Sequence, residues 1–117
     1  MKYLFIVLAA LSLFFFSLTP DVMAQPAAGE KLFQKLRCTK CHHPDKKING
    51  PALKTIVRAY GTPEKLLGYF KGESDPIVEP GRAKTMKIRR KKIKKLQDDE
   101  RQSLVDYFFS FQGAKDE

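Results

Sequence analysis

Residues 38–43 read Cys-Thr-Lys-Cys-His-His (CTKCHH), and this stretch holds both cysteines and both histidines of the 117-residue chain. Thiols and imidazoles are nucleophiles and metal ligands, so six residues concentrate most of the reactive chemistry of the sequence. A C-x-x-C pair serves three chemistries: a redox-active dithiol, a zinc site, and the covalent attachment of a haem. The surrounding sequence has to distinguish among them.

The residues around the motif argue against the first two chemistries. A thioredoxin-like dithiol follows a strand in a βαβ unit, whereas Cys38 follows the helical pattern of residues 27–37. Structural zinc takes four ligands, usually as two separated pairs, and no second pair follows His43. Cysteines three positions apart lie about one helical turn apart, so both sulfurs can reach the vinyl groups of one porphyrin edge. The spacing therefore predicts a haem bound through Cys38 and Cys41, with His42 as the iron ligand.

His43 has a different expected role. Adjacent residues in one turn cannot both reach the same face of an iron, so His43 is not expected to share the ligand position of His42. We interpret His43, which precedes Pro44, as a surface or loop-capping residue.

Residues 1–24 carry the pattern of a secretory signal. Lys2 precedes an apolar run over residues 4–18, and the small-residue pattern Val22-Met23-Ala24 follows, which predicts cleavage after Ala24. An uncleaved membrane anchor is the alternative, although the apolar run is shorter than the roughly 20 residues of a spanning helix. Export predicts a periplasmic protein, and residues 25–117 then form one small domain.

Hydrophobic spacing predicts that this domain is all-α, with about four short helices. Helical patterns cover residues 27–37, 53–60, 63–71 and 98–111, and no stretch has the alternation of a strand. Residues 73–95 show little periodicity, and we expect a loop there that continues into a basic run.

Met86 is the candidate for a second iron ligand. It is the one methionine of residues 25–117, where no third histidine occurs, and it lies in the basic sequence KTMKIRR, outside any apolar stripe. We predict that Met86 binds the iron opposite His42. A thioether ligand raises the reduction potential and fills the position that oxygen or peroxide would need.

With these residues the sequence resembles the class I c-type cytochromes, the mitochondrial cytochrome c-like family, over essentially all of residues 25–117. The segment Gly50-Pro51-Ala52-Leu53 matches the GPxL segment of that family. The resemblance implies that the Pro51 carbonyl accepts a hydrogen bond from the ring of His42, which orients the ligand. It also implies one covalent haem c, bound by Cys38 and Cys41.

The resemblance also covers the first and last helices. Residues 29–33 (GEKLF) look like the N-terminal helix of the family, in which Gly29 and Phe33 would cross the C-terminal helix near Leu104 and Tyr107.

Two positions depart from the family pattern. Lys87, rather than the proline common in bacterial members, follows Met86. Gln97 stands where a serine or aspartate N-cap would be expected, so the last helix is predicted to begin at Asp98 or to lack a strong cap.

Residues 82–95 (RAKTMKIRRKKIKK) carry nine basic residues and no acidic one, and the whole chain has a net charge of +9. Part of this charge simply solvates the surface. If Met86 binds the iron, the run borders the haem edge and would steer the protein toward acidic redox partners. Anionic lipid headgroups are a further possible contact, whereas export argues against nucleic acid.

We expect a monomeric single-electron carrier with a His42–Met86 iron, acting between larger redox proteins. The sequence offers no paired acid and base groups for a substrate, so we do not expect an enzyme. Two alternatives stay open: a cytochrome subunit of a membrane-associated oxidoreductase or respiratory complex, and a five-coordinate ligand sensor or peroxidase with Met86 off the iron.

Overall fold

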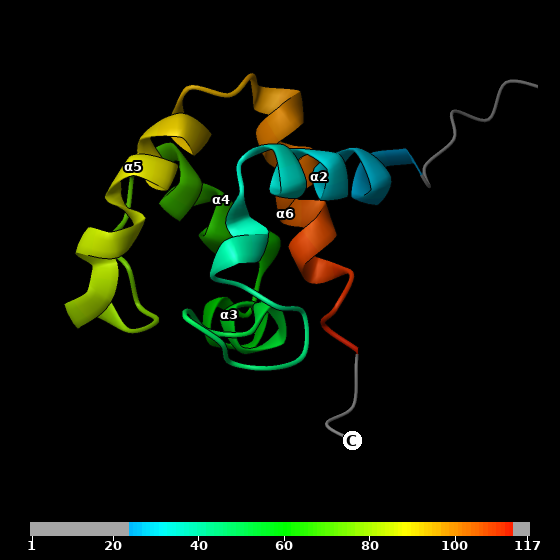
Figure 1. The fold of residues 1–117 in the computed structure, drawn as a ribbon. Helices are drawn as coiled ribbons and strands as arrows, with labels where there is room; N and C mark the ends of the chain where they lie inside the picture. The colour runs from blue at the N-terminus through cyan, green and yellow to red at the C-terminus, as the bar shows by residue number, and fades with distance from the viewer. Residues whose placement is uncertain (1–23, 114–117) are drawn as a thin grey trace, which may run out of the picture.

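A computed structural model describes residues 24–113, which form five α-helices, two 3₁₀ turns and no β-strand (Figure 1). The predicted all-α domain is confirmed, and the signal predicted over residues 1–24 lies almost wholly outside the described residues. In chain order the elements are α2 (Ala24–Lys35), η1 (Cys38–Lys40), α3 (Leu53–Tyr60), α4 (Pro63–Lys71), η2 (Pro80–Arg82), α5 (Ala83–Lys94) and α6 (Asp98–Phe109).

The first and last helices of this domain, α2 and α6, cross in close contact (Figure 1). A Cβ atom at Gly29 would lie 2.0 Å from the Ser103 carbonyl oxygen and 2.7 Å from the Cβ of Tyr107, so only glycine fits. One turn later, the Phe33 ring packs on Tyr107 with a centroid separation of 5.4 Å. Leu104 is fully buried in the same cluster. The crossing that the family resemblance implied is therefore confirmed.

Helices α3 and α4 begin and end at the residues that the sequence indicated. Gly61, with φ of 79°, ends α3. The Thr62 hydroxyl accepts a hydrogen bond from the Lys65 backbone N–H at 3.4 Å, and Pro63 occupies the first helical position of α4. Gly72 closes α4 in the left-handed conformation, which glycine adopts without strain.

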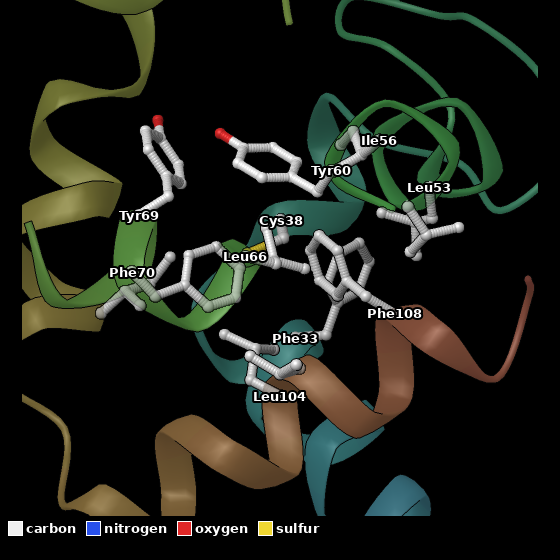
Figure 2. Packing of buried hydrophobic residues seen from close by; sticks show 13 residues of the cluster. Phe33, Cys38, Leu53, Ile56, Tyr60, Leu66, Tyr69, Phe70, Leu104 and Phe108 are labelled. Carbon is white, nitrogen blue, oxygen red and sulfur yellow. The ribbon is translucent and has the colours of Figure 1, made fainter. Parts of the chain in front are cut away.

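Aromatic side chains from four elements meet in one core (Figure 2). The ring of Phe108 stands edge-on to Phe70 at 5.5 Å and to Phe33 at 5.7 Å. The rings of Tyr60 and Tyr69 lie beside each other, with their centroids 5.7 Å apart. Figure 2 shows both hydroxyl groups pointing away from the packed phenyl rings. This core therefore joins α2, α3, α4 and α6, and the hydroxyl groups of Tyr60 and Tyr69 form its polar edge.

Helix α5 corrects the prediction for residues 73–95. Residues 83–94 are helical rather than part of a loop, so residues 24–113 contain five helices where about four were expected. Lysine, arginine, methionine and alanine all favour a helix. The apolar periodicity was missing because Ile93 is the one buried side chain of α5. A helix that buries so little has no hydrophobic pattern to detect.

Helix α6 begins at Asp98, as one of the two expectations had it. The Gln97 backbone N–H donates to the Glu100 carboxylate at 3.0 Å. This bond is the glutamate half of a capping box, so the missing serine or aspartate is partly compensated.

Candidate haem site

A cavity of about 550 Å³ opens between the cysteine motif, the core and α5. This volume is in the usual range for a small-molecule or cofactor site. All five predicted site residues line it: Cys38, Cys41, His42, Pro51 and Met86. The apolar and aromatic part of its wall comes from Ile56, Tyr60, Leu66, Tyr69, Phe70, Ile93 and Phe108.

The two cysteines are carried on a tight turn. Arg37 adopts the left-handed conformation, with φ of 58°, and so turns the chain out of α2. The backbone N–H groups of Cys41 and His42 then both donate to the Cys38 carbonyl, at 3.1 and 2.9 Å. Cys38 is buried and Cys41 exposed, yet both line the cavity. The turn thus presents two thiols and an imidazole to one space.

The ring of His42 is held in one orientation and one tautomer. Its Nδ1 lies 2.8 Å from the Pro51 carbonyl oxygen. Because a carbonyl can only accept, Nδ1 carries the proton and the lone pair of Nε2 is left for a metal. Gly50 makes room for the ring, since a Cβ there would lie 2.9 Å from His42 Cε1. The Pro51 contact implied by the family resemblance is present, whereas the steric role of Gly50 emerged only from the structure.

His43 lies outside the cavity wall and caps the following loop. Its Nδ1 accepts from the Asp45 backbone N–H at 3.0 Å, and its carbonyl accepts from the Leu53 N–H at 3.0 Å. The loop-capping interpretation is confirmed.

The thiols do not have the environment of a redox dithiol. Burial raises the pKa of Cys38 to about 11, whereas redox-active cysteines depend on a lowered thiol pKa. A zinc site also lacks support, because the part of the chain that the structure describes has no cluster of three or more metal-binding side chains. Of the three chemistries that the motif allows, haem attachment is the one that fits.

Met86 lies in the first turn of α5, half-buried at the cavity wall. The segment before it is tied to the loop that follows His42. Arg82 donates to the Asn49 carbonyl at 2.8 Å, and Arg82 and Lys47 both pair with Glu79. The Lys47 hydrogen bond holds the pKa of Glu79 below its usual value, so the carboxylate stays charged at neutral pH. These ties bring the histidine and methionine sides of the cavity together.

Arginines and lysines of the basic run have different environments. Arg90 donates to the Ser74 carbonyl at 2.6 Å, and its guanidinium lies 4.5 Å from the centre of the Tyr69 ring. The lysines of the run are exposed: Lys84, Lys87, Lys91, Lys92, Lys94 and Lys95. Composition predicts one uniform basic surface, because it does not reveal which cations have hydrogen-bond or ring partners.

The Tyr60 hydroxyl tests whether the cavity suits a haem. It is buried and makes no hydrogen bond of standard length and angle within residues 24–113. Burial raises its pKa, which keeps the hydroxyl protonated. The Ile77 backbone N–H opposes that shift, but an N–H cannot accept, so the phenol proton still lacks an acceptor. Haem carries carboxylates that accept such a bond, and with the thiols, imidazole, thioether and apolar wall the residues present fit the group.

Fold and cavity together define a small all-α haem protein. The sequence profile of the cytochrome c family matches residues 26–111, and the chain belongs to that family. It accordingly binds a haem c, with Cys38 and Cys41 as the attachment residues in the CxxCH spacing. No curated protein matches the chain. Within residues 24–113, no helix has the length and apolar character needed to cross a membrane.

Proposed function

We propose that this cytochrome carries single electrons and that His42 and Met86 are its two iron ligands. The observation that carries the proposal is that both side chains line one cavity, with His42 Nε2 freed for a metal by the bond to Pro51. The bound haem supplies one-electron chemistry through the ferrous and ferric states of its iron.

The residues of the chain support such a role in four ways. The Pro51 carbonyl orients His42 and makes it a stronger ligand. Aromatic walls keep water away, and the half-buried Arg89 at the cavity wall adds positive charge that favours the less positive ferrous state. Among described residues of the cavity wall, Glu79 is the one carboxylate, and it is paired with Lys47. A carrier needs no further acid or base.

The first prediction concerns Met86. In wild-type protein we expect the weak far-red absorption band of methionine-bound ferric haem. Met86→Ala should abolish this band and lower the reduction potential by a sizeable part of the roughly 0.8 V range that axial ligands span. Optical spectra and a redox titration measure both effects.

Lys87→Ala is the matched control, because Lys87 is adjacent and exposed, and it should retain the band. A wild-type protein that lacks the band, is high-spin and binds carbon monoxide or peroxide readily would contradict the carrier and support the sensor or peroxidase alternative.

The partner is proposed to be an acidic redox protein. The six exposed lysines of residues 84–95 named above, here called the lysine face, belong to α5 and the residue after it, and α5 also contributes Met86 and Arg89 to the cavity wall. Positive charge beside a redox centre raises the association rate with an acidic partner by about 10 to 1,000-fold at low ionic strength.

The second prediction tests the lysine face. Changing Lys84, Lys87 and Lys91 to glutamate should slow electron transfer to an acidic redox protein by about tenfold or more at low salt, and the difference should shrink as salt rises. Stopped-flow kinetics at several ionic strengths measure it. The same change at Lys31, Lys35 and Lys65, exposed on α2 and α4, is the control. Equal slowing by both triple variants would mean that net charge alone matters. Binding to anionic vesicles would instead favour a membrane contact.

Export to the periplasm is proposed from the signal pattern of residues 1–24. The N-terminal sequence of the protein recovered from the periplasm checks this, since it should begin at Gln25. A full-length protein retained in the membrane would favour the anchored-subunit alternative.

A further inference from the structure

Helix α5, which carries Met86, has little support of its own. Ile93 is its one buried side chain, its first turn contains no acidic residue, and its N-cap, Arg82, makes no side-chain capping bond. Basic residues near the N-terminus oppose the helix dipole, and like charges three or four positions apart repel. Isolated helices of about 12 residues are marginal even in favourable sequences. The position of α5 therefore depends on bonds from other elements.

The C-terminal end of α5 is held by Arg101, which comes from α6 and is buried, with 6% of its surface exposed. Its guanidinium donates to three backbone carbonyls, those of Ile93 at 3.4 Å and Lys94 at 3.0 Å in the last turn of α5, and that of Leu96 at 2.7 Å just after it. The remaining nitrogen, Nη1, donates to the Asp98 carboxylate at 2.7 Å. Carbonyls at the end of a helix lack the regular intrahelical partner; here the Ile93 carbonyl also accepts from the Leu96 backbone N–H at 3.1 Å. A cation at this end matches the helix dipole.

The fork of the guanidinium is what makes this contact possible. Arginine offers five donors in a fixed plane, whereas lysine offers a single ammonium. Bonds from a charged donor are roughly twice as strong as neutral ones, and here the donor side chain is largely buried. Asp98 contributes less, because its own side chain is 95% exposed. The bonds to the backbone carbonyls, rather than the ion pair with Asp98, therefore hold the end of α5.

Helix α5 connects this contact to the cavity. Ile93 and Met86 lie two turns apart on the same helix and both line the cavity wall. We propose that Arg101 is a positioning residue for Met86: by fixing the last turns of α5 on α6, it keeps the thioether at the iron. The inference rests on the proposed His42–Met86 ligation and extends it to a residue outside the cavity.

The experiment measures how readily imidazole replaces Met86 in the haem-loaded ferric protein. Arg101→Gln should raise the imidazole affinity about tenfold or more, and Arg101→Lys should give an intermediate increase. Hydrogen exchange on the same samples should show lost protection in α5 before α2 and α6. If the glutamine variant fails to fold, the lysine variant still provides the comparison.

Two variants separate positioning from general stability. Val57→Ala removes buried methyl groups from α3, a helix that packs on α4 and α6. It should lower stability while leaving the imidazole affinity unchanged. Asp98→Asn removes the ion pair and keeps the carbonyl bonds, so it should resemble wild type.

The outcomes distinguish the two proposals. If wild type lacks the methionine band, the proposed ligation is overturned, and the role of Arg101 in it falls as well. If the band is present but Arg101→Gln changes imidazole affinity no more than Val57→Ala does, the ligation stands and the positioning role of Arg101 is overturned.

Discussion

Gly29→Ala is expected to cost more than about 3 kcal/mol of folding free energy, beyond the usual penalty for an overpacked core. The added Cβ would lie 2.0 Å from the Ser103 carbonyl oxygen and 2.7 Å from the Ser103 carbonyl carbon. Both are backbone atoms of α6, so no side-chain rotation can relieve the clash, and the two helices would have to separate. Denaturant unfolding of the haem-loaded protein measures the loss.

Gly81→Ala is the control for this prediction. A Cβ at Gly81 meets no atom within 4 Å, and its φ is not positive, so its effect should stay within about 0.5 kcal/mol. Equal midpoints for the two variants would show that α2 and α6 do not cross as closely as described. Because Phe33 and Tyr107 pack beside this crossing, a real separation would also expose their rings, which near-ultraviolet dichroism detects.

Changing both Cys38 and Cys41 to serine is expected to abolish covalent haem attachment and, with it, cooperative folding. The void left by one leucine already costs about 2.7–5.0 kcal/mol, and whole domains are stable by only about 5–15 kcal/mol. The cavity here is about 550 Å³ and has a largely apolar wall, so a chain without its cofactor would have to collapse or open. Haem staining after denaturing electrophoresis and thermal dichroism measure the two effects.

Lys40→Ala is the control, because Lys40 lies in the same turn and is exposed. This variant should keep both the covalent haem and the cooperative unfolding transition. A double-serine variant that unfolds as sharply as this control would contradict a structural role for the cofactor. The folding of the chain would then be independent of the site that it encloses.

Much of the fold was predictable because its signals are local. Gly61, Thr62 and Pro63 mark the boundary between α3 and α4, and they do so through backbone conformation and one hydrogen bond between near neighbours. The haem motif is likewise local, since its spacing alone places two thiols and an imidazole on one turn. Position by position, these parts of the sequence could be interpreted without knowing the rest of the chain.

Helix α5 was missed because hydrophobic periodicity reports burial. Ile93 alone is buried in it, so the helix has no apolar stripe, and its lysines and arginines read as one basic run. The different roles of Arg82 and Arg90 appear only when Asn49 and Ser74, their backbone partners, are brought beside them. The arginines are separated from those partners by many residues in the chain, and no local pattern encodes such pairs.

The sequence by itself determined the cofactor chemistry, the all-α class and the candidate ligands, because each depends on residue type and short-range spacing. Only the tertiary structure decided what holds those ligands. It placed Gly50 against the His42 ring, left the Tyr60 hydroxyl without an acceptor among the described residues and brought Arg101 to the end of α5. Those are contacts between distant parts of the chain, and they exist only after the core has set the distances between its helices.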